Sequence, residues 1–317
     1  MGIDRHGLIA LEYVSKKGAN FDTVCAIGRQ QIQADKLFYE QVLKKTGNIN
    51  RLEQLNKING EIYFEYFENL FKSLFQSTII DSIDVCEYEG ASIIHDLNFS
   101  LTDSQIKKQK YSLIIDFGCL EHVFNTAVAF DNIINICEKM GTILHILPAN
   151  QMVGHGFYQF SPEFFFSMYT SKRGFEDTEV FVSEILTPYK WFQVTNPIEL
   201  KRRVCLSSKD SLYIIVKTTK VSSDKSTLLI NPLQQSDFVS LYKQEKKGDD
   251  EIGGERQKNS FMKELKTFIK SNKTLYKLGL KIVRPLRIII NKMHNQMLLS
   301  NNKNLKKENI LNKIKYH

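Results

Sequence analysis

The stretch Tyr111–Asn125, YSLIIDFGCLEHVFN, decides the fold prediction. It begins with a run of apolar and branched residues and then turns polar at Asp116, Gly118 and Glu121. A short apolar run that ends in this way is typical of a buried strand followed by a loop. In open parallel sheets, ligands bind outside the carboxyl ends of the strands. The polar residues after the run are therefore candidate site residues.

Similar runs recur along the chain and alternate with segments of helical periodicity. The predicted strands are Thr23–Ile27, Thr78–Ile83, Ser92–Ile94, Tyr111–Ile115, Thr142–Leu147, Glu179–Ile185 and Ser211–Thr218. The predicted helical segments are Gln30–Gln76, interrupted at Gly47 and Gly60, then Asn125–Met140 and Pro162–Thr170. Strands that alternate with helices predict an α/β fold whose central sheet is mostly parallel and covered by helices on both faces.

Six residues at the predicted strand ends are candidates for ligand binding. They are Gly28, Arg29, Asp84, Asp96, Asp116 and Glu121. A glycine turn, one acid for ribose hydroxyls (Asp84) and one acid for an adenine amino group (Asp96) together suggest a nucleoside site without phosphates. The alternative is that Gly28 only ends a strand and that the acids cap helices or turns.

Two groups of motifs resemble a known family. Asp116–Asn125, followed by Ile133–Ile136 and Gly141, resembles class I S-adenosylmethionine (SAM)-dependent methyltransferases. Asp84 with EYEGA (87–91), HDLN (95–98) and GHGFYQFSP (154–162) resembles methyltransferase-like proteins of bacterial surface-polysaccharide gene clusters. The resemblance covers about residues 20–220. It implies a Rossmann-like class I fold with SAM as the cofactor, bound by the six strand-end residues.

The resemblance also implies a reaction, the transfer of a methyl group to a sugar or glycolipid intermediate. Such a transfer needs alignment of donor and acceptor, and a base if the acceptor is a hydroxyl. We expect His155, between Gly154 and Gly156, as the first candidate base and His122 as the second. For His122, a structural hydrogen bond is the alternative. Arg29 could meet the methionine carboxylate or pair with an acid of the protein.

The first motif departs from the family and keeps other function classes open. Family members have several glycines there, which let the backbone approach the cofactor, whereas Ala26–Gln31 has only Gly28. The gap between Gly28 and Asp84 is also wider than usual. The alternative function is therefore a non-catalytic interaction protein of a membrane-associated glycan assembly. A third class, NAD-dependent oxidoreductases, fits less well because the chain has no G-x-G-x-x-G motif.

Composition sets the remaining expectations. The 317 residues are 42% hydrophobic and 25% charged, without an apolar run of 18 residues and without a signal-peptide pattern, so we expect a cytoplasmic globular protein. The five cysteines are widely spaced and none lies in C-x-x-C, so we expect reduced thiols and no metal site.

Charge divides the chain into unlike parts. Residues 1–200 hold 17 Lys+Arg against 25 Asp+Glu, and residues 201–317 hold 26 against 10. We predict a methyltransferase-like domain over 1–242, a flexible linker over 243–260 and a basic amphipathic helical tail over 261–317 that frays from Ser300 on. Residues 261–299 could bind an anionic membrane surface, which would make the protein peripheral on the inner face of the membrane, or dock on a protein. Nucleic acid is not expected, because no binding module is present.

Overall fold

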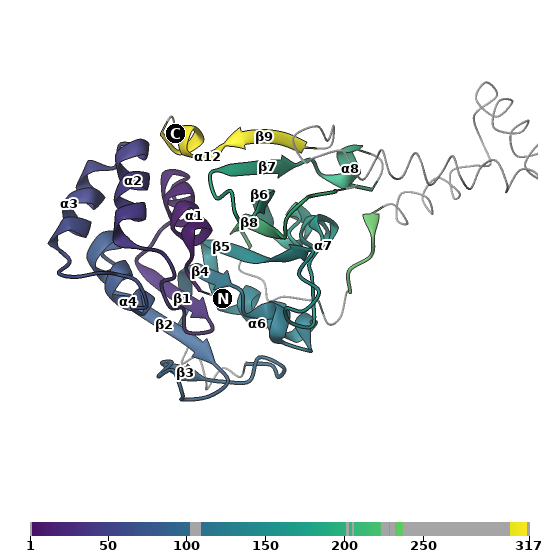
Figure 1. The fold of residues 1–317 in the computed structure, drawn as a ribbon. Coiled ribbons are helices and arrows are strands. Elements are labelled where there is room, and N and C mark those ends of the chain that lie inside the picture. Colours follow the sequence, from purple (N-terminus) through teal and green to yellow (C-terminus); the bar gives the residue numbers. More distant parts are fainter. Residues whose placement is uncertain are drawn as a thin grey trace, which may run out of the picture.

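The described part of the chain is built around one sheet, in which the first strand of the chain lies beside the fourth and the strand order reverses between them. The computed structural model describes residues 2–101, 109–200, 203–204, 206–222, 228, 232–236 and 305–315. Within them, nine strands pair in the order β3-β2-β1-β4-β5-β8-β6-β7-β9 (Figure 1). The strands are β1 (Thr23–Ile27), β2 (Ile79–Asp84), β3 (Ile93–Ile94), β4 (Tyr111–Phe117), β5 (Cys137–Asn150), β6 (Phe175–Glu184), β7 (Lys190–Val194), β8 (Leu212–Lys220) and β9 (Leu305–Asn309).

The sheet is parallel in one half and antiparallel in the other. β3, β2, β1, β4 and β5 run parallel, whereas β8, β6, β7 and β9 each pair antiparallel with their neighbours. The prediction of a mostly parallel sheet is therefore right only for the first half. The loop between β6 and β7 is too short for the crossover that a parallel pair needs, so these strands form an antiparallel pair.

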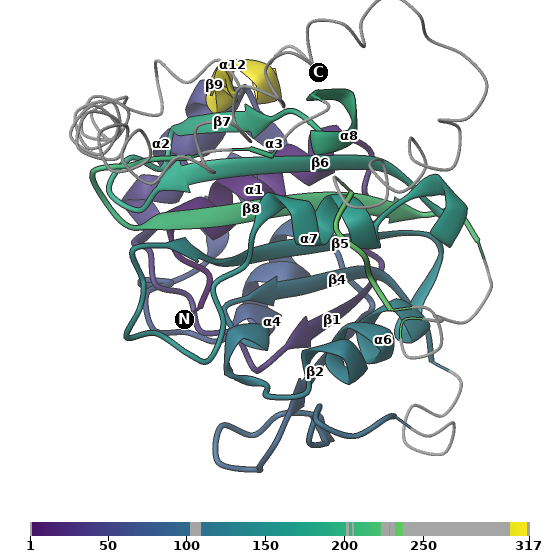
Figure 2. The same ribbon diagram turned by 90° about the vertical axis from the view of Figure 1, so that its right-hand side faces the viewer.

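Helices cover both faces, as predicted (Figures 1 and 2). Residues alternate along β4: Leu113 and Ile115 pack into the core under α1 to α4, and Ile114 packs into the core under α6 and α7. The helices are α1 (Arg5–Lys16), α2 (Lys36–Thr46), α3 (Ile49–Lys57), α4 (Phe67–Leu70), which continues as the π-helical turn η1 (Phe71–Phe75), η2 (Leu120–His122), α6 (Thr126–Ile136), α7 (Pro162–Met168), η3 (Ser171–Arg173), α8 (Pro197–Leu200) and α12 (Ile310–Lys315).

The wide gap between Gly28 and Asp84 is filled by three helical segments. α2 ends at Gly47, whose φ of 72° is the left-handed C-cap conformation that favours glycine. α3 and the α4–η1 segment then lead to β2. The predicted helical region with interruptions at Gly47 and Gly60 is thus confirmed in outline. α1, which Asp4 caps by accepting from the Gly7 amide, was not predicted.

The last described segment joins the sheet. β9 pairs antiparallel with β7, and α12 packs against α1 and α2. Ile310 and Ile314 of α12 are fully buried. The expectation that the chain frays from Ser300 on is wrong for Leu305–Lys315, because β9 pairs with β7 and three apolar side chains of α12 (Ile310, Leu311 and Ile314) lie in the core. The predicted linker (243–260) and the tail segment 261–299 lie outside the described residues.

Among the described helices, none combines the length and the apolar character needed to cross a bilayer.

Candidate functional site

The strand order reverses between β1 and β4, and this is where an open α/β sheet binds its ligands. Gly28 follows β1 with a φ of 70°. A Cβ atom on Gly28 would lie 3.3 Å from the Cys119 Sγ, which follows β4. The two strand ends are therefore in close contact, and only glycine fits on the β1 side without strain.

The end of β2 is bonded to the end of β1. Asp84 accepts hydrogen bonds from the Arg29 amide at 3.2 Å and from the Val85 amide at 2.7 Å. The Gly28 amide donates to the Ile83 carbonyl at 2.8 Å. Asp84 is half-buried, so its carboxylate is oriented by the backbone and still reaches solvent.

The Arg29 side chain is engaged by the protein itself. Its Nε donates to the Glu68 carboxylate at 2.8 Å, and its guanidinium lies 3.9 Å from the centre of the Tyr66 ring. Its Nη1 donates to the Glu89 carbonyl. Of the two alternatives for Arg29, pairing with an acid of the protein is the one present in this structure.

Asp96 and Asp116 both bond to their own surroundings. Asp96 accepts from the amide and the side chain of Asn98 at 2.9 and 2.8 Å, which closes a turn after β3. Asp116 is fully buried, accepts from the Cys119 amide at 3.1 Å and lies 2.9 Å from Nδ1 of His145. Asp116 thus holds the loop after β4 through a backbone hydrogen bond, and its side chain is not exposed to solvent.

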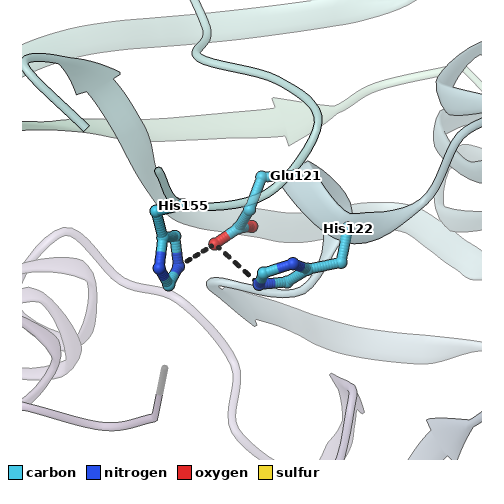
Figure 3. Close-up of side chains that lie close together, drawn as sticks. All are labelled: Glu121, His122 and His155. Carbon is cyan, nitrogen blue, oxygen red and sulfur yellow. Dashed lines mark hydrogen bonds and ion pairs between the residues drawn. The ribbon is translucent and has the colours of Figure 1, made fainter. Parts of the chain in front are cut away.

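The three remaining predicted residues form one cluster. Glu121 and His122 lie on η2 after β4, and His155 lies on the loop after β5; Figure 3 shows both imidazoles turned toward the Glu121 carboxylate. The Glu121 Oε1 is 3.2 Å from Nε2 of His155 and 3.7 Å from Nε2 of His122. The Glu121 side chain is fully buried, whereas those of His155 and His122 are 35% and 49% exposed.

Backbone contacts hold the His155 loop against Glu121. The Glu121 carbonyl accepts from the amides of Phe157 at 2.7 Å and Tyr158 at 3.3 Å. Gly156 has a φ of 73°, and a Cβ atom there would lie 2.7 Å from the Glu121 carbonyl oxygen. The approach of the two segments therefore requires glycine at 156, whereas Gly154 has open space around it.

Burial perturbs the ionisation of the cluster. It raises the pKa of Glu121 to about 8, with Asp116 adding to the shift. Burial also lowers the pKa of His122, as does the neighbouring His155, and burial lowers the pKa of His155 itself. Burial, Asp116, Glu121 and Asp84, in that order, raise the pKa of the Cys119 thiol. These acids thus act electrostatically on the same thiol.

The structure therefore brings most of the predicted residues to one edge. Gly28, Arg29 and Asp84 form one directly bonded group, Glu121, His122 and His155 form a second, and Cys119 lies between them. Asp96 is bonded within its own loop, and Asp116 is beneath the surface. Cys119 was not predicted as a site residue, because a single thiol is more often a small core residue than a ligand. His145, the buried partner of Asp116, was not predicted either, because a histidine inside a strand gives no signal of its own.

No family model matches the chain, and no curated protein matches it. A solved SAM-dependent methyltransferase of Thermotoga maritima, described as a possible histamine N-methyltransferase, is similar at 12% identity and a TM-score of 0.31 over 67% of this chain and 92% of that one. A SAM-dependent methyltransferase of Clostridium acetobutylicum is similar at 8% identity and a TM-score of 0.25, over 69% of this chain and 76% of that one. The CcbJ methyltransferase of Streptomyces caelestis is similar at 10% identity and a TM-score of 0.25, over 69% of this chain and 89% of that one. At these identities and TM-scores the likeness assigns neither a family nor an activity to this chain.

Proposed function

We propose that the chain is a SAM-dependent methyltransferase whose cofactor binds at the carboxyl edge of β1, β2 and β4. The observation that carries the proposal is the approach of three strand ends at the point where the strand order reverses. Gly28 lies against Cys119, two residues before Glu121, and the Arg29 amide that follows Gly28 donates to Asp84. In folds of this kind that point is the nucleoside-binding position.

Asp84 fits a ribose ligand. Each of its carboxylate oxygens accepts one backbone hydrogen bond, although a carboxylate oxygen can accept two. The second acceptor position of each oxygen is available for a hydroxyl group. Two neighbouring hydroxyls of a ribose match this pair of acceptors.

The second group of residues suits the acceptor end of the site. SAM, when bound, supplies a methyl group on a positively charged sulfur. The chain then has to align an acceptor and accept its proton. His155 is the first candidate for the proton, because its Nε2 already faces Glu121 at 3.2 Å, and His122 is the second. Glu121 would orient both rings.

Titration calorimetry of the full chain with SAM tests the proposal. We expect saturable binding, and we expect Asp84→Asn to weaken it by about tenfold or more, because the substitution replaces one acceptor oxygen with a donor. Glu53→Gln on α3 is the matched control, since it removes one negative charge from an exposed position away from this edge. Equal weakening by both substitutions, or no binding at millimolar SAM, contradicts the proposal.

The acceptor that we propose is a sugar or glycolipid intermediate of surface-polysaccharide synthesis. It rests on the resemblance of the segments at 84–98 and 154–162 to proteins of such gene clusters. A screen of nucleotide sugars and lipid-linked sugars for SAM-dependent methylation tests this choice. Methylation confined to non-sugar acceptors would contradict it.

A non-catalytic interaction protein of a glycan assembly is the second candidate. Arg29 favours it, because its side chain is bonded to Glu68 and to the Glu89 carbonyl and so is engaged within the protein. This candidate predicts that the folded chain gives no heat with SAM, so the same titration distinguishes the two functions.

We also propose that residues 261–299 attach the protein to an anionic membrane surface from the cytoplasmic side, with docking on a partner protein as the alternative. The basis is the excess of Lys and Arg among apolar residues in this segment.

A further inference from the structure

We infer that Glu121, His122 and His155 bind a divalent transition-metal ion, with Zn²⁺ as the representative ion. The inference goes beyond methyl transfer and does not rest on it, because metal binding can be measured without SAM. The three side chains each offer one ligand atom, and these atoms all lie within 4.8 Å of one another. Among the described residues, no other group of His, Cys, Asp and Glu has this geometry.

The distances match those between ligands that share one ion. Two ligands at about 2.0–2.1 Å from a tetrahedral Zn²⁺ are about 3.3 Å from each other. The Glu121 Oε1 lies 3.2 Å from Nε2 of His155 and 3.7 Å from Nε2 of His122. The nitrogens of the two imidazoles in Figure 3 lie within 4.8 Å of each other, so they have to approach somewhat to share an ion, and both rings are partly exposed.

The buried Glu121 carboxylate also lacks a full set of partners. The Glu121 side chain is fully buried, and its Oε2 has no hydrogen-bond partner. A buried carboxylate oxygen in this state costs free energy unless something pairs with it. A cation held by the Glu121 carboxylate and two imidazoles would neutralise the carboxylate.

The backbone segments that carry the ligands are also joined to each other before any ion arrives. The Glu121 carbonyl bonds to the amides of Phe157 and Tyr158, and the Tyr158 hydroxyl donates to the Phe124 carbonyl at 2.7 Å. The loop that carries His155 is thus tied at two points to the segment that carries Glu121 and His122. Support of the segments that carry the ligands strengthens metal affinity.

Ligand chemistry selects the class of ion. Imidazole nitrogens suit Zn²⁺, Fe²⁺, Co²⁺ and Ni²⁺, whereas Mg²⁺ and Ca²⁺ prefer sets made of oxygen. Two histidines and one glutamate leave at least one coordination position for water or substrate. An ion here would occupy one nitrogen of each imidazole, so the base role proposed for His155 belongs to the metal-free chain.

Titration of the full chain, stripped with a chelator, with Zn²⁺ and then Co²⁺ tests the inference. The measurements use a Cys86→Ser background, because Cys86 is an exposed thiol that could bind these ions. We expect one Zn²⁺ per chain, a visible Co²⁺ spectrum of low-symmetry coordination, and no competition from Mg²⁺. Glu121→Gln, which keeps the side-chain shape, should abolish this site.

Paired variants of the His155 loop separate metal binding from folding. His155→Ala removes a partly exposed side chain that we propose as a ligand. Loss of a residue that only supports a ligand typically weakens metal affinity by about 10–100-fold, and this substitution should weaken Zn²⁺ affinity by more. Gly156→Ala should weaken it by about 10–100-fold, because its Cβ would push the loop from Glu121. Gly154→Ala, with open space around it, should bind as the parent does. Zn²⁺ binding that is unchanged in both Glu121→Gln and His155→Ala would overturn the inference, even if SAM binds.

Discussion

Gly28 is the residue on which the closeness of the two central strand ends depends. Its φ of 70° favours glycine, and the Cys119 thiol lies where a side chain would go. Gly18 has a φ of 84° and nothing within 4 Å of the same position. The two glycines therefore share the backbone conformation and differ in their surroundings.

Gly28→Ala should lower the free energy of unfolding by about 1–3 kcal/mol, through backbone strain and the contact with Cys119. Gly18→Ala should cost less, because only the backbone term applies. Urea unfolding measures both. In the double variant Gly28→Ala with Cys119→Ala, part of the loss should be recovered. Equal costs for the two glycine variants would show that the contact with Cys119 does not matter.

Glu121 should make the stability of the chelator-treated protein depend on pH. Its pKa is raised from 4.5 to about 8 in the folded state, so the folded chain binds more protons than the unfolded chain between these values. Stability from this group is full below the lower value and is lost as pH rises through the higher one. Urea unfolding across this range should show a falling stability that Glu121→Gln flattens. A constant difference between the two proteins would contradict the raised pKa.

The residues of the site carry local sequence signals, whereas their partners do not. Glu121, His122 and His155 were all predicted, because strand ends and a Gly-His-Gly loop give local signals. Both histidines face the same Glu121 oxygen only because the loop after β5 packs against η2, which brings His155 to Glu121, 34 positions earlier in the chain. The expectation of no metal site followed from cysteine spacing, which is silent on such a cluster.

At the scale of elements, β9 and α12 are structured segments that the sequence did not predict. Ile310, Leu311 and Ile314 are buried in the core on the side of α1 and α2. Lys313 lies 3.8 Å from the Glu179 carboxylate and 5.2 Å from the centre of the Phe181 ring. A polar composition rich in Asn and Lys concealed these apolar positions.

Ile314→Ala should lower the free energy of unfolding by about 2–5 kcal/mol, because it leaves a cavity under a fully buried side chain. Asn312→Ala on the same helix is exposed and should change it by no more than about 0.5 kcal/mol. Thermal and urea unfolding of the full chain measure both. A stable Ile314→Ala protein would mean that α12 does not contribute to the core.

The strands of the parallel half could be predicted from their runs of branched residues. In the antiparallel half β6 and β8 were predicted as strands, but their antiparallel pairing was not. β1 was predicted to the residue, whereas β7, which carries Trp191 and Phe192, was not predicted. They do pack: Trp191 is fully buried and its Nε1 donates to the Pro188 carbonyl at 2.9 Å. Pairing partners depend on contacts distant in sequence, which local patterns do not contain.

At the scale of the whole molecule, the charge is divided between an acidic part and a basic segment. Residues 255–317 carry 16 Lys+Arg against three Glu. Liposome flotation should show the full chain bound to vesicles with anionic lipid and released by salt, since each cation contributes about 1 kcal/mol near the headgroups. Replacement of the basic residues of 261–299 by Gln should abolish flotation. Flotation unaffected by this replacement would remove the membrane proposal.

The most direct test of the proposed site is a crystal structure of the full chain with S-adenosylhomocysteine, the demethylated form of SAM. We predict that the adenosyl group lies at the ends of β1, β2 and β4, with its ribose hydroxyls on Asp84 and its sulfur toward the Glu121 cluster. An edge without ligand at saturating concentration, or the adenosyl group bound elsewhere, would contradict the account.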